Sequence, residues 1–80
     1  MAQIDLNNLK RLDKNRNTIH EKVFATYTVF QKDAAKYLQI DTYGKTDREN
    51  PEKISQSFQV DREVAEFLVN LLSSEFDIDA

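Results

Sequence analysis

The sequence predicts an α+β domain in which an antiparallel sheet of three to four strands carries one C-terminal amphipathic helix, packed on one face. Two observations predict this class. Runs rich in Val, Thr, Phe, Tyr and Ile occupy residues 21–31, 36–44 and 54–60, and their alternating apolar positions are typical of half-buried strands. From residue 61 to 76, apolar side chains instead recur at helical spacing.

Composition indicates one small domain over residues 1–80. The chain is 40% hydrophobic and 31% charged and has no cysteine, which excludes a disulfide framework and a thiolate metal site and agrees with a cytoplasmic location. A chain of this size buries only about 60% of its unfolded surface, so a homodimer is expected. No apolar run is long enough for a signal peptide or a transmembrane helix, so we expect no membrane partner.

The net charge of −3 conceals an uneven distribution. Residues 1–60 hold ten Lys/Arg against eight Asp/Glu, a balance of +2, and residues 61–80 hold one against six, a balance of −5. Like charges repel within a Debye length of about 8 Å. An anionic partner is therefore expected to avoid the last quarter of the chain, and nucleic acid is not excluded.

Residues 1–20 form an N-terminal segment ahead of the predicted sheet. The three leucines of "IDLNNLKRLD" (residues 4–13) recur at every third position, which suits a short helix after Asp5, although ten residues are too few for a helix that is stable alone. The polar residues 14–18 that follow indicate a linker into the first strand.

The first two strands are expected to form a hairpin. They flank "KDAA" (residues 32–35), which is short enough for a four-residue loop although it lacks glycine. Directly opposed residues share a face of the sheet. Counting outward from the loop predicts four pairs on one face: Phe30 with Tyr37, Thr28 with Gln39, Thr26 with Asp41, and Phe24 with Tyr43.

Both strands independently place aromatic rings with Thr, Gln and Asp on one face and aliphatic side chains on the other. The second face is predicted to be the core face, and its members are Val23, Ala25, Tyr27, Val29, Leu38 and Ile40. A loop longer or shorter by one residue would destroy this match, so the agreement supports the register.

The third strand and the helix follow a charged loop at residues 44–53. "ISQSFQV" (residues 54–60) alternates as a strand does, Asp61 is suited to cap the helix, and Glu63 adds negative charge to its first turn. The helix stripe is wide enough to cover the core face. It consists of Val64, Phe67, Leu68, Leu71 and Leu72. Sheet and helix together are expected over residues 21–76, with residues 77–80 frayed.

No catalytic or metal-binding motif is present, so no enzymatic activity, cofactor or metal is expected. His20 is the only histidine, and no run has the acidic spacing of a calcium loop. Asp41, Asp47 and Glu49 would suit a magnesium-dependent nuclease, but no Glu/Asp-x-Lys triplet lies on a strand beside them. The serines lack the glycines of a nucleophile elbow.

The leading functional hypothesis is a sheet face that binds single-stranded nucleic acid. Stacking of a base on an aromatic ring is worth ~1–3 kcal/mol, and lysines and arginines beside the face would meet phosphates. The predicted contact residues are Lys36, Tyr37, Gln39, Tyr43, Lys45, Arg48, Lys53, Ser55 and Ser57. An equally weighted alternative is that the rings pack under the N-terminal leucines or against a second subunit.

The order of these elements resembles a known family. A strand "KYLQIDTYG", a basic loop, a strand "KISQSFQV" and an Asp-capped amphipathic helix, over about residues 22–76, are similar to the positive-cofactor-four family of single-stranded-DNA-binding transcriptional coactivators and their bacterial relatives. The resemblance implies a curved sheet that binds single strands on the face away from the helix, and dimerisation through the helices. By position it implies contacts from Lys36, Tyr37, Gln39, Tyr43, Lys45, Lys53 and Ser55.

The chain departs from that family at two places. Pro51-Glu52-Lys53 stands where the family has a glycine-lysine-glycine type of turn, and the helix has no Trp. The stretches "LQIDTYG" and "SQSFQVD" also resemble short uncharacterised bacterial proteins, a resemblance that implies no activity.

A protein-interaction module is the rival hypothesis, such as an inhibitor or regulatory subunit from a phage or defence locus. Acidic side chains of the last quarter would engage a basic partner, although such charges commonly form only a solvated helix face. They are Asp61, Glu63, Glu66, Glu75, Asp77 and Asp79.

Overall fold

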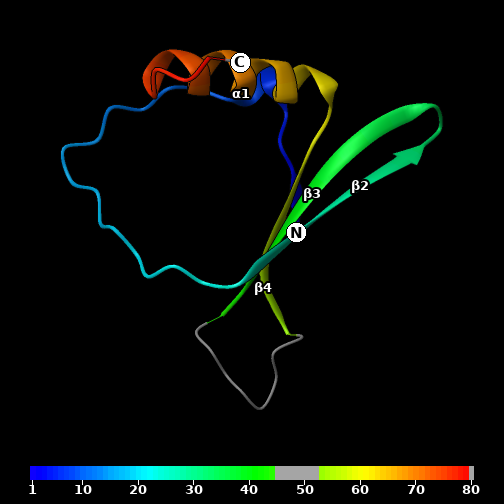
Figure 1. The fold of residues 1–80 in the computed structure, drawn as a ribbon, viewed down its shortest axis with the longest axis horizontal. Helices are drawn as coiled ribbons and strands as arrows, with labels where there is room; N and C mark the ends of the chain where they lie inside the picture. Colours follow the sequence, from blue (N-terminus) through cyan, green and yellow to red (C-terminus); the bar gives the residue numbers. More distant parts are fainter. Residues whose placement is uncertain (45–52, 80) are drawn as a thin grey trace.

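The computed structural model describes residues 1–44 and 53–79, which form a four-stranded sheet and one α-helix (Figure 1). The predicted α+β class with one C-terminal helix is confirmed. The strands lie in the order β1-β4-β3-β2. The elements are β1 (Ala2–Gln3), the 3-10 helix η1 (Leu6–Asn8), β2 (Ala25–Lys32), β3 (Ala35–Tyr43), β4 (Ile54–Val60) and α1 (Arg62–Glu75).

The predicted hairpin register is confirmed across the whole of β2 and β3. Phe30 pairs with Tyr37, and Thr26 pairs with Asp41. The Tyr43 amide donates to the Phe24 carbonyl at 3.0 Å and extends the ladder beyond the end of β2. The two strands therefore have the aromatic and polar face and the aliphatic face that their alternation predicts.

The connection in this hairpin is shorter than the predicted four-residue loop. Lys32 pairs with Ala35, which leaves Asp33 and Ala34 as a two-residue turn with φ values of 53° and 66°. Two consecutive positive φ values in a two-residue hairpin loop indicate a type I′ turn, which matches the twist of the strands. The register is unchanged because each strand extends by one residue toward the turn and the same pairs are kept.

Replacing Ala34 with Gly is expected to stabilise the protein by about 0.5–1 kcal/mol, because an L-residue with a side chain is strained in the left-handed region and glycine is not. Urea denaturation followed by far-UV circular dichroism measures the change. Ala35 is the matched control, because it is a strand residue outside the group with positive φ. Ala35→Gly should destabilise by a similar amount, and equal midpoints for the two variants would contradict the turn assignment.

The sheet is mixed, because β1 pairs with β4 in parallel through Ala2 with Phe58 and Gln3 with Gln59. The prediction allowed a fourth strand but expected antiparallel pairing throughout. Two residues carry no alternation that would reveal a strand or its direction. The predicted helix after Asp5 is a single 3-10 turn, in which the Asp5 side chain accepts from the Asn7 amide at 3.0 Å.

Helix α1 begins where the sequence predicts. The Asp61 carboxylate accepts from the Val64 amide at 3.0 Å, and Glu63 lies in the first turn. At the other end Asp77, predicted to lie in a frayed tail, adopts φ 53°, and the Ile78 amide donates to the Ser73 carbonyl at 3.0 Å. The left-handed Asp77 and the bond from Ile78 to Ser73 together close the helix as a C-terminal cap does.

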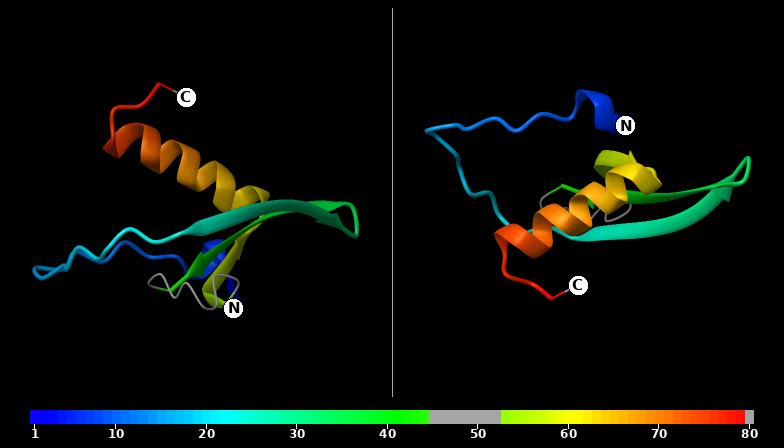
Figure 2. Two further views of the ribbon diagram at one scale, coloured as in Figure 1. Left: turned by 60° about the horizontal axis from the view of Figure 1, so that its bottom comes forward. Right: turned by 90° about the horizontal axis from the view of Figure 1, so that it is seen from above.

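The helix packs against the sheet chiefly at β4. Val60 and Val64 are 2% and 0% exposed and are the buried hydrophobic residues of the described chain. Figure 2 shows α1 on one side of the sheet, directed away from the β2–β3 hairpin. The predicted core face therefore stays largely open along β2, where Tyr27 is 76% and Val29 55% exposed. The stripe is wide enough to cover that face, but the helix leaves the end of β4 in another direction.

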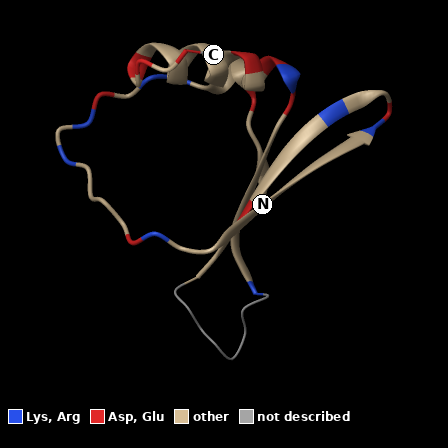
Figure 3. Ribbon diagram, in the orientation of Figure 1, with Lys and Arg blue, Asp and Glu red and all other residues tan. Residues whose placement is uncertain are grey.

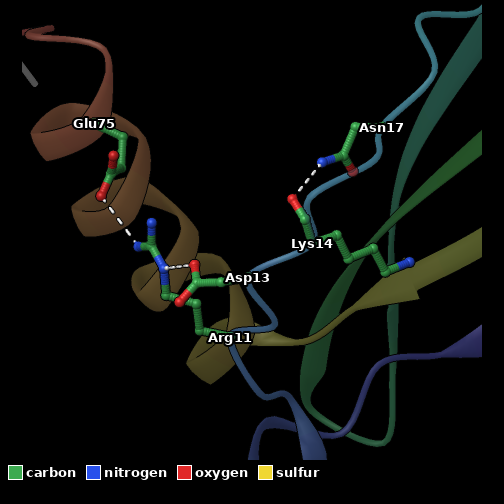
Figure 4. A network of polar contacts seen from close by, with 5 residues as sticks. All are labelled: Arg11, Asp13, Lys14, Asn17 and Glu75. Atoms are coloured by element: carbon green, nitrogen blue, oxygen red, sulfur yellow. Dashed lines mark hydrogen bonds and ion pairs between the residues drawn. The ribbon is translucent and has the colours of Figure 1, made fainter.

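The N-terminal segment reaches the far end of α1 through Arg11 (Figure 4). Its guanidinium lies 3.2 Å from the Glu75 carboxylate and 3.3 Å from the Asp13 carboxylate. The hydrogen bond to Asp13 and, as the second cause, the hydrogen bond to Glu75 raise the pKa of Arg11. The three side chains are at the surface, so these ion pairs contribute little to stability.

Candidate nucleic-acid interface

One face of the sheet, here named the polar face, collects the aromatic and polar side chains of three strands. Val60 is buried beside the helix and pairs with Leu38, so both side chains lie on the helix side of the sheet. The neighbours of these residues in each strand, and every second residue from there, lie on the side away from α1. The polar face is formed by Phe24, Thr26, Thr28, Phe30, Tyr37, Gln39, Asp41, Tyr43, Ser57 and Gln59.

Two ring pairs frame this face. Phe30 stacks on Tyr37 beside the hairpin turn, with ring centroids 5.5 Å apart and an angle of 24° between the ring planes. Phe24 lies against Tyr43 at 5.2 Å and 48°. The pairs are six residues apart along β3, which corresponds to about 20 Å. Phe24 is 64% exposed and the other three rings are half-buried. The two rings of each pair therefore contact one another on one side, and the outer side of the pair stays accessible to solvent.

A chain of hydrogen bonds occupies the centre of the polar face. Gln59 Nε2 donates to Gln39 Oε1 at 2.8 Å, and Gln39 Nε2 donates to Asp41 Oδ1 at 2.9 Å. The Ser57 hydroxyl donates to the same oxygen of Asp41. These bonds fix the orientation of both amides, because each glutamine has one carbonyl acceptor and one NH₂ donor group.

Asp41 is the central group of this network and is the buried polar residue of the described chain, with 6% exposure. A second polar contact joins Thr26 and Tyr43, whose hydroxyl oxygens are 3.1 Å apart. No buried side-chain nitrogen or oxygen among the described residues is left without a partner. The polar face is therefore ordered before any ligand arrives.

The structure brings together four of the nine predicted contact residues: Tyr37, Gln39, Tyr43 and Ser57. Lys36 shares its parity with Leu38 and lies on the helix side, since successive strand residues alternate between faces. Ser55 is exposed where the β3–β4 register shifts, and Lys53 is exposed just before β4. Lys45 and Arg48 lie outside the described residues.

Two further residues of this face, Asp41 and Lys32, are absent from the nine predicted contact residues. Asp41 was paired correctly with Thr26, but its position at the centre of the hydrogen-bond chain depends on Ser57 of β4, and no local pattern places β4 beside it. Lys32 pairs with Ala35 and has the parity of Phe30, so it lies on the polar face at the hairpin end. The alternation of β2 was sufficient to predict that position.

Several acidic residues lie on α1, whereas the strands carry few charged residues (Figure 3). The helix carries Glu63, Glu66 and Glu75, of which Glu66 is bonded to Arg62 at 2.9 Å and Glu75 to Arg11 at 3.2 Å. The polar face carries the Asp41 carboxylate and Lys32. An anionic ligand is therefore repelled less on the polar face than along the helix.

Within residues 1–44 and 53–79, no three His, Cys, Asp or Glu side chains gather as metal ligands would. In the same part of the chain, no helix has the length and apolar character needed to cross a membrane. No protein-family model, curated protein or solved structure matches this chain.

Proposed function

We propose that the polar face binds an extended single strand of nucleic acid. The observation that carries the proposal is the arrangement of two ring pairs around an ordered polar network, on the side of the sheet away from the acidic helix. Bases would stack on the outer surfaces of the ring pairs, and base edges would meet the glutamine amides between them. Sequence-tolerant binding of this kind combines stacking with a backbone path.

The spacing of the ring pairs suits a ligand of several nucleotides. About 20 Å separates the two pairs along β3, and single-strand sites commonly span about 4–16 nucleotides. Lys32 at the hairpin end and Lys53 before β4 offer phosphate contacts beyond the rings. Affinity is therefore expected to depend more on stacking than on charge, with a salt slope of about −2 or shallower, because few phosphates are neutralised.

A Tyr37→Ala, Tyr43→Ala double variant is expected to bind a fluorescent oligothymidine about 30-fold more weakly than the natural chain. Each ring already has one face against its neighbour, so a loss of about 1 kcal/mol for each ring, at the low end of the stacking range, is the appropriate estimate. Fluorescence anisotropy at low salt measures the affinity, and circular dichroism verifies the fold.

Phe76→Ala is the matched control, because Phe76 is an aromatic ring that is 67% exposed at the end of the helix. This variant should bind as the natural chain does. Undiminished binding by the double tyrosine variant would overturn the proposal, as would an affinity that does not change with salt.

A protein partner on the helix is the second candidate function. It is supported by apolar side chains on α1 and just beyond it, which are exposed beside acidic residues. They are Phe67 at 40%, Leu72 at 45%, Val69 at 53% and Phe76 at 67%. Exposed apolar positions rimmed by charge are typical of interaction sites. If no oligonucleotide binds at low salt, loss of a captured partner in Phe67→Ala and Phe76→Ala would support this second function.

A further inference from the structure

The chain exposes far more surface than a compact protein of its mass. Its accessible surface is 7645 Å², whereas about 5,000 Å² is expected for a compact chain of 9.3 kDa. Its radius of gyration is 14.9 Å, against about 12 Å for a compact chain of this length. The excess of more than about 2,000 Å² is larger than the ~800 Å² that each partner buries in an ordinary stable interface.

Strand β2 is an open edge of the sheet. In the described part of the chain it has a neighbour only on the β3 side, whereas the opposite edge is the two-residue β1. Natural proteins protect long edges with proline, charge or bulges. β2 has the sequence ATYTVFQK, with no proline and no charge before Lys32, and its register with β3 is continuous.

The hydrogen-bonding direction of each residue in β2 follows from the ladder. The Tyr43 amide donates to the Phe24 carbonyl, and residues in an antiparallel pair alternate between bonding to the neighbour and facing the other way. The even-numbered residues of β2 therefore bond to β3. Four residues direct both backbone groups to the open edge: Ala25, Tyr27, Val29 and Gln31.

We propose that a second copy of this chain pairs with β2 in antiparallel fashion, about a two-fold axis through Thr28. In this register, paired residues have numbers that add to 56: Ala25 lies opposite Gln31 and Tyr27 opposite Val29. All four edge-facing residues then exchange both backbone hydrogen bonds with the partner. A shift by two residues in either direction leaves some of them unpaired.

The side chains of β2 are complementary to themselves in this register. Tyr27 and Val29, which are 76% and 55% exposed in one chain, form a pair of aromatic and β-branched residues that stabilises antiparallel strands. The only charged residue of the strand, Lys32, meets Phe24, so no like charges are opposed. A two-fold axis that runs perpendicular to the sheet keeps both polar faces on one side, and the dimer has one continuous sheet.

Thr28→Cys is the decisive variant, because the natural chain has no cysteine and the Thr28 side chain is exposed. In the proposed dimer the two Thr28 residues are a non-hydrogen-bonded pair with Cα atoms about 4.5 Å apart, which a disulfide can span. Thr26→Cys is the matched control, since its two copies would be about 13 Å apart along the strands. Under mild oxidation, Thr28→Cys should form a disulfide-linked dimer at least about tenfold faster than Thr26→Cys.

Val29→Pro provides an independent measurement by light scattering. The Val29 amide faces the open edge, so proline there removes a bond to the partner without removing one to β3. The natural chain should have twice its monomer mass of 9.3 kDa, and Val29→Pro should be monomeric with an unchanged circular dichroism spectrum. A monomeric natural chain, or equal cross-linking of the two cysteine variants, would overturn the proposal. So would a dimer that persists in Val29→Pro, which would indicate the exposed helix stripe as the interface.

Discussion

Val64→Asp is expected to leave the chain without a cooperative fold. Val64 is 0% exposed and is one of two fully buried hydrophobic side chains in the described chain. The substitution loses about 1.5–3 kcal/mol of apolar burial and places an unpaired carboxylate in an apolar site, which costs several kcal/mol more. A chain of this length has a total stability of about 4–12 kcal/mol. Far-UV circular dichroism should show loss of the helix signal and no sigmoidal melting.

A substitution at Val64 distinguishes the effect of burial on stability from the effect of helix propensity. It is the third residue of α1, and its amide donates to the Asp61 cap, so an acidic side chain there is favourable for the helix alone. Val69→Asp is the matched control, because Val69 is in the same helix but is 53% exposed. It should change stability by less than about 1 kcal/mol. A folded Val64→Asp variant would show that α1 is not held to the sheet through this contact.

The hairpin register was predictable because the alternation of both strands and the short segment between them favour the same pairing. The pairs of Phe30 with Tyr37 and Thr26 with Asp41 follow from side-chain parity and the number of intervening residues. The start of α1 was predictable for a similar reason, since Asp61 precedes an uninterrupted apolar stripe at helical spacing. In both cases the decisive information is local in the sequence.

Features that depend on contacts distant in sequence were not predictable. A helical stripe tells which side of α1 is apolar but not which surface it meets, so coverage of Tyr27 and Val29 was expected although both are exposed. The parallel pairing of β1 with β4 brings together segments more than fifty residues apart in the sequence. The central position of Asp41 in the candidate site likewise arises from its contact with Ser57 across the sheet.

Asp41→Ala is expected to destabilise the protein by about 3 kcal/mol. Asp41 is 6% exposed and accepts hydrogen bonds from the Gln39 amide and the Ser57 hydroxyl. A hydrogen bond to a charged group contributes about 1.5–3 kcal/mol, and each donor left without an acceptor adds a desolvation cost. Asp41→Asn is the matched control and should lose only about 1 kcal/mol, because its carbonyl oxygen keeps one acceptor in place. Urea denaturation orders the three proteins, and equal midpoints for the natural chain and Asp41→Ala would contradict the network.

The same pair of variants tests the chemistry of the polar face. Asp41 places a negative charge between the ring pairs, where it repels phosphates of a bound strand by about 0.5–1 kcal/mol at separations near 8 Å in a high effective dielectric. Asp41→Asn removes that charge and keeps the shape, so it should bind the fluorescent oligothymidine about two- to fivefold more tightly although it is less stable. A network that only supports folding would leave the binding affinity of this variant unchanged. Tighter binding by a less stable protein therefore requires an anionic ligand close to Asp41, and weaker binding would place the carboxylate in contact with donors of the ligand instead.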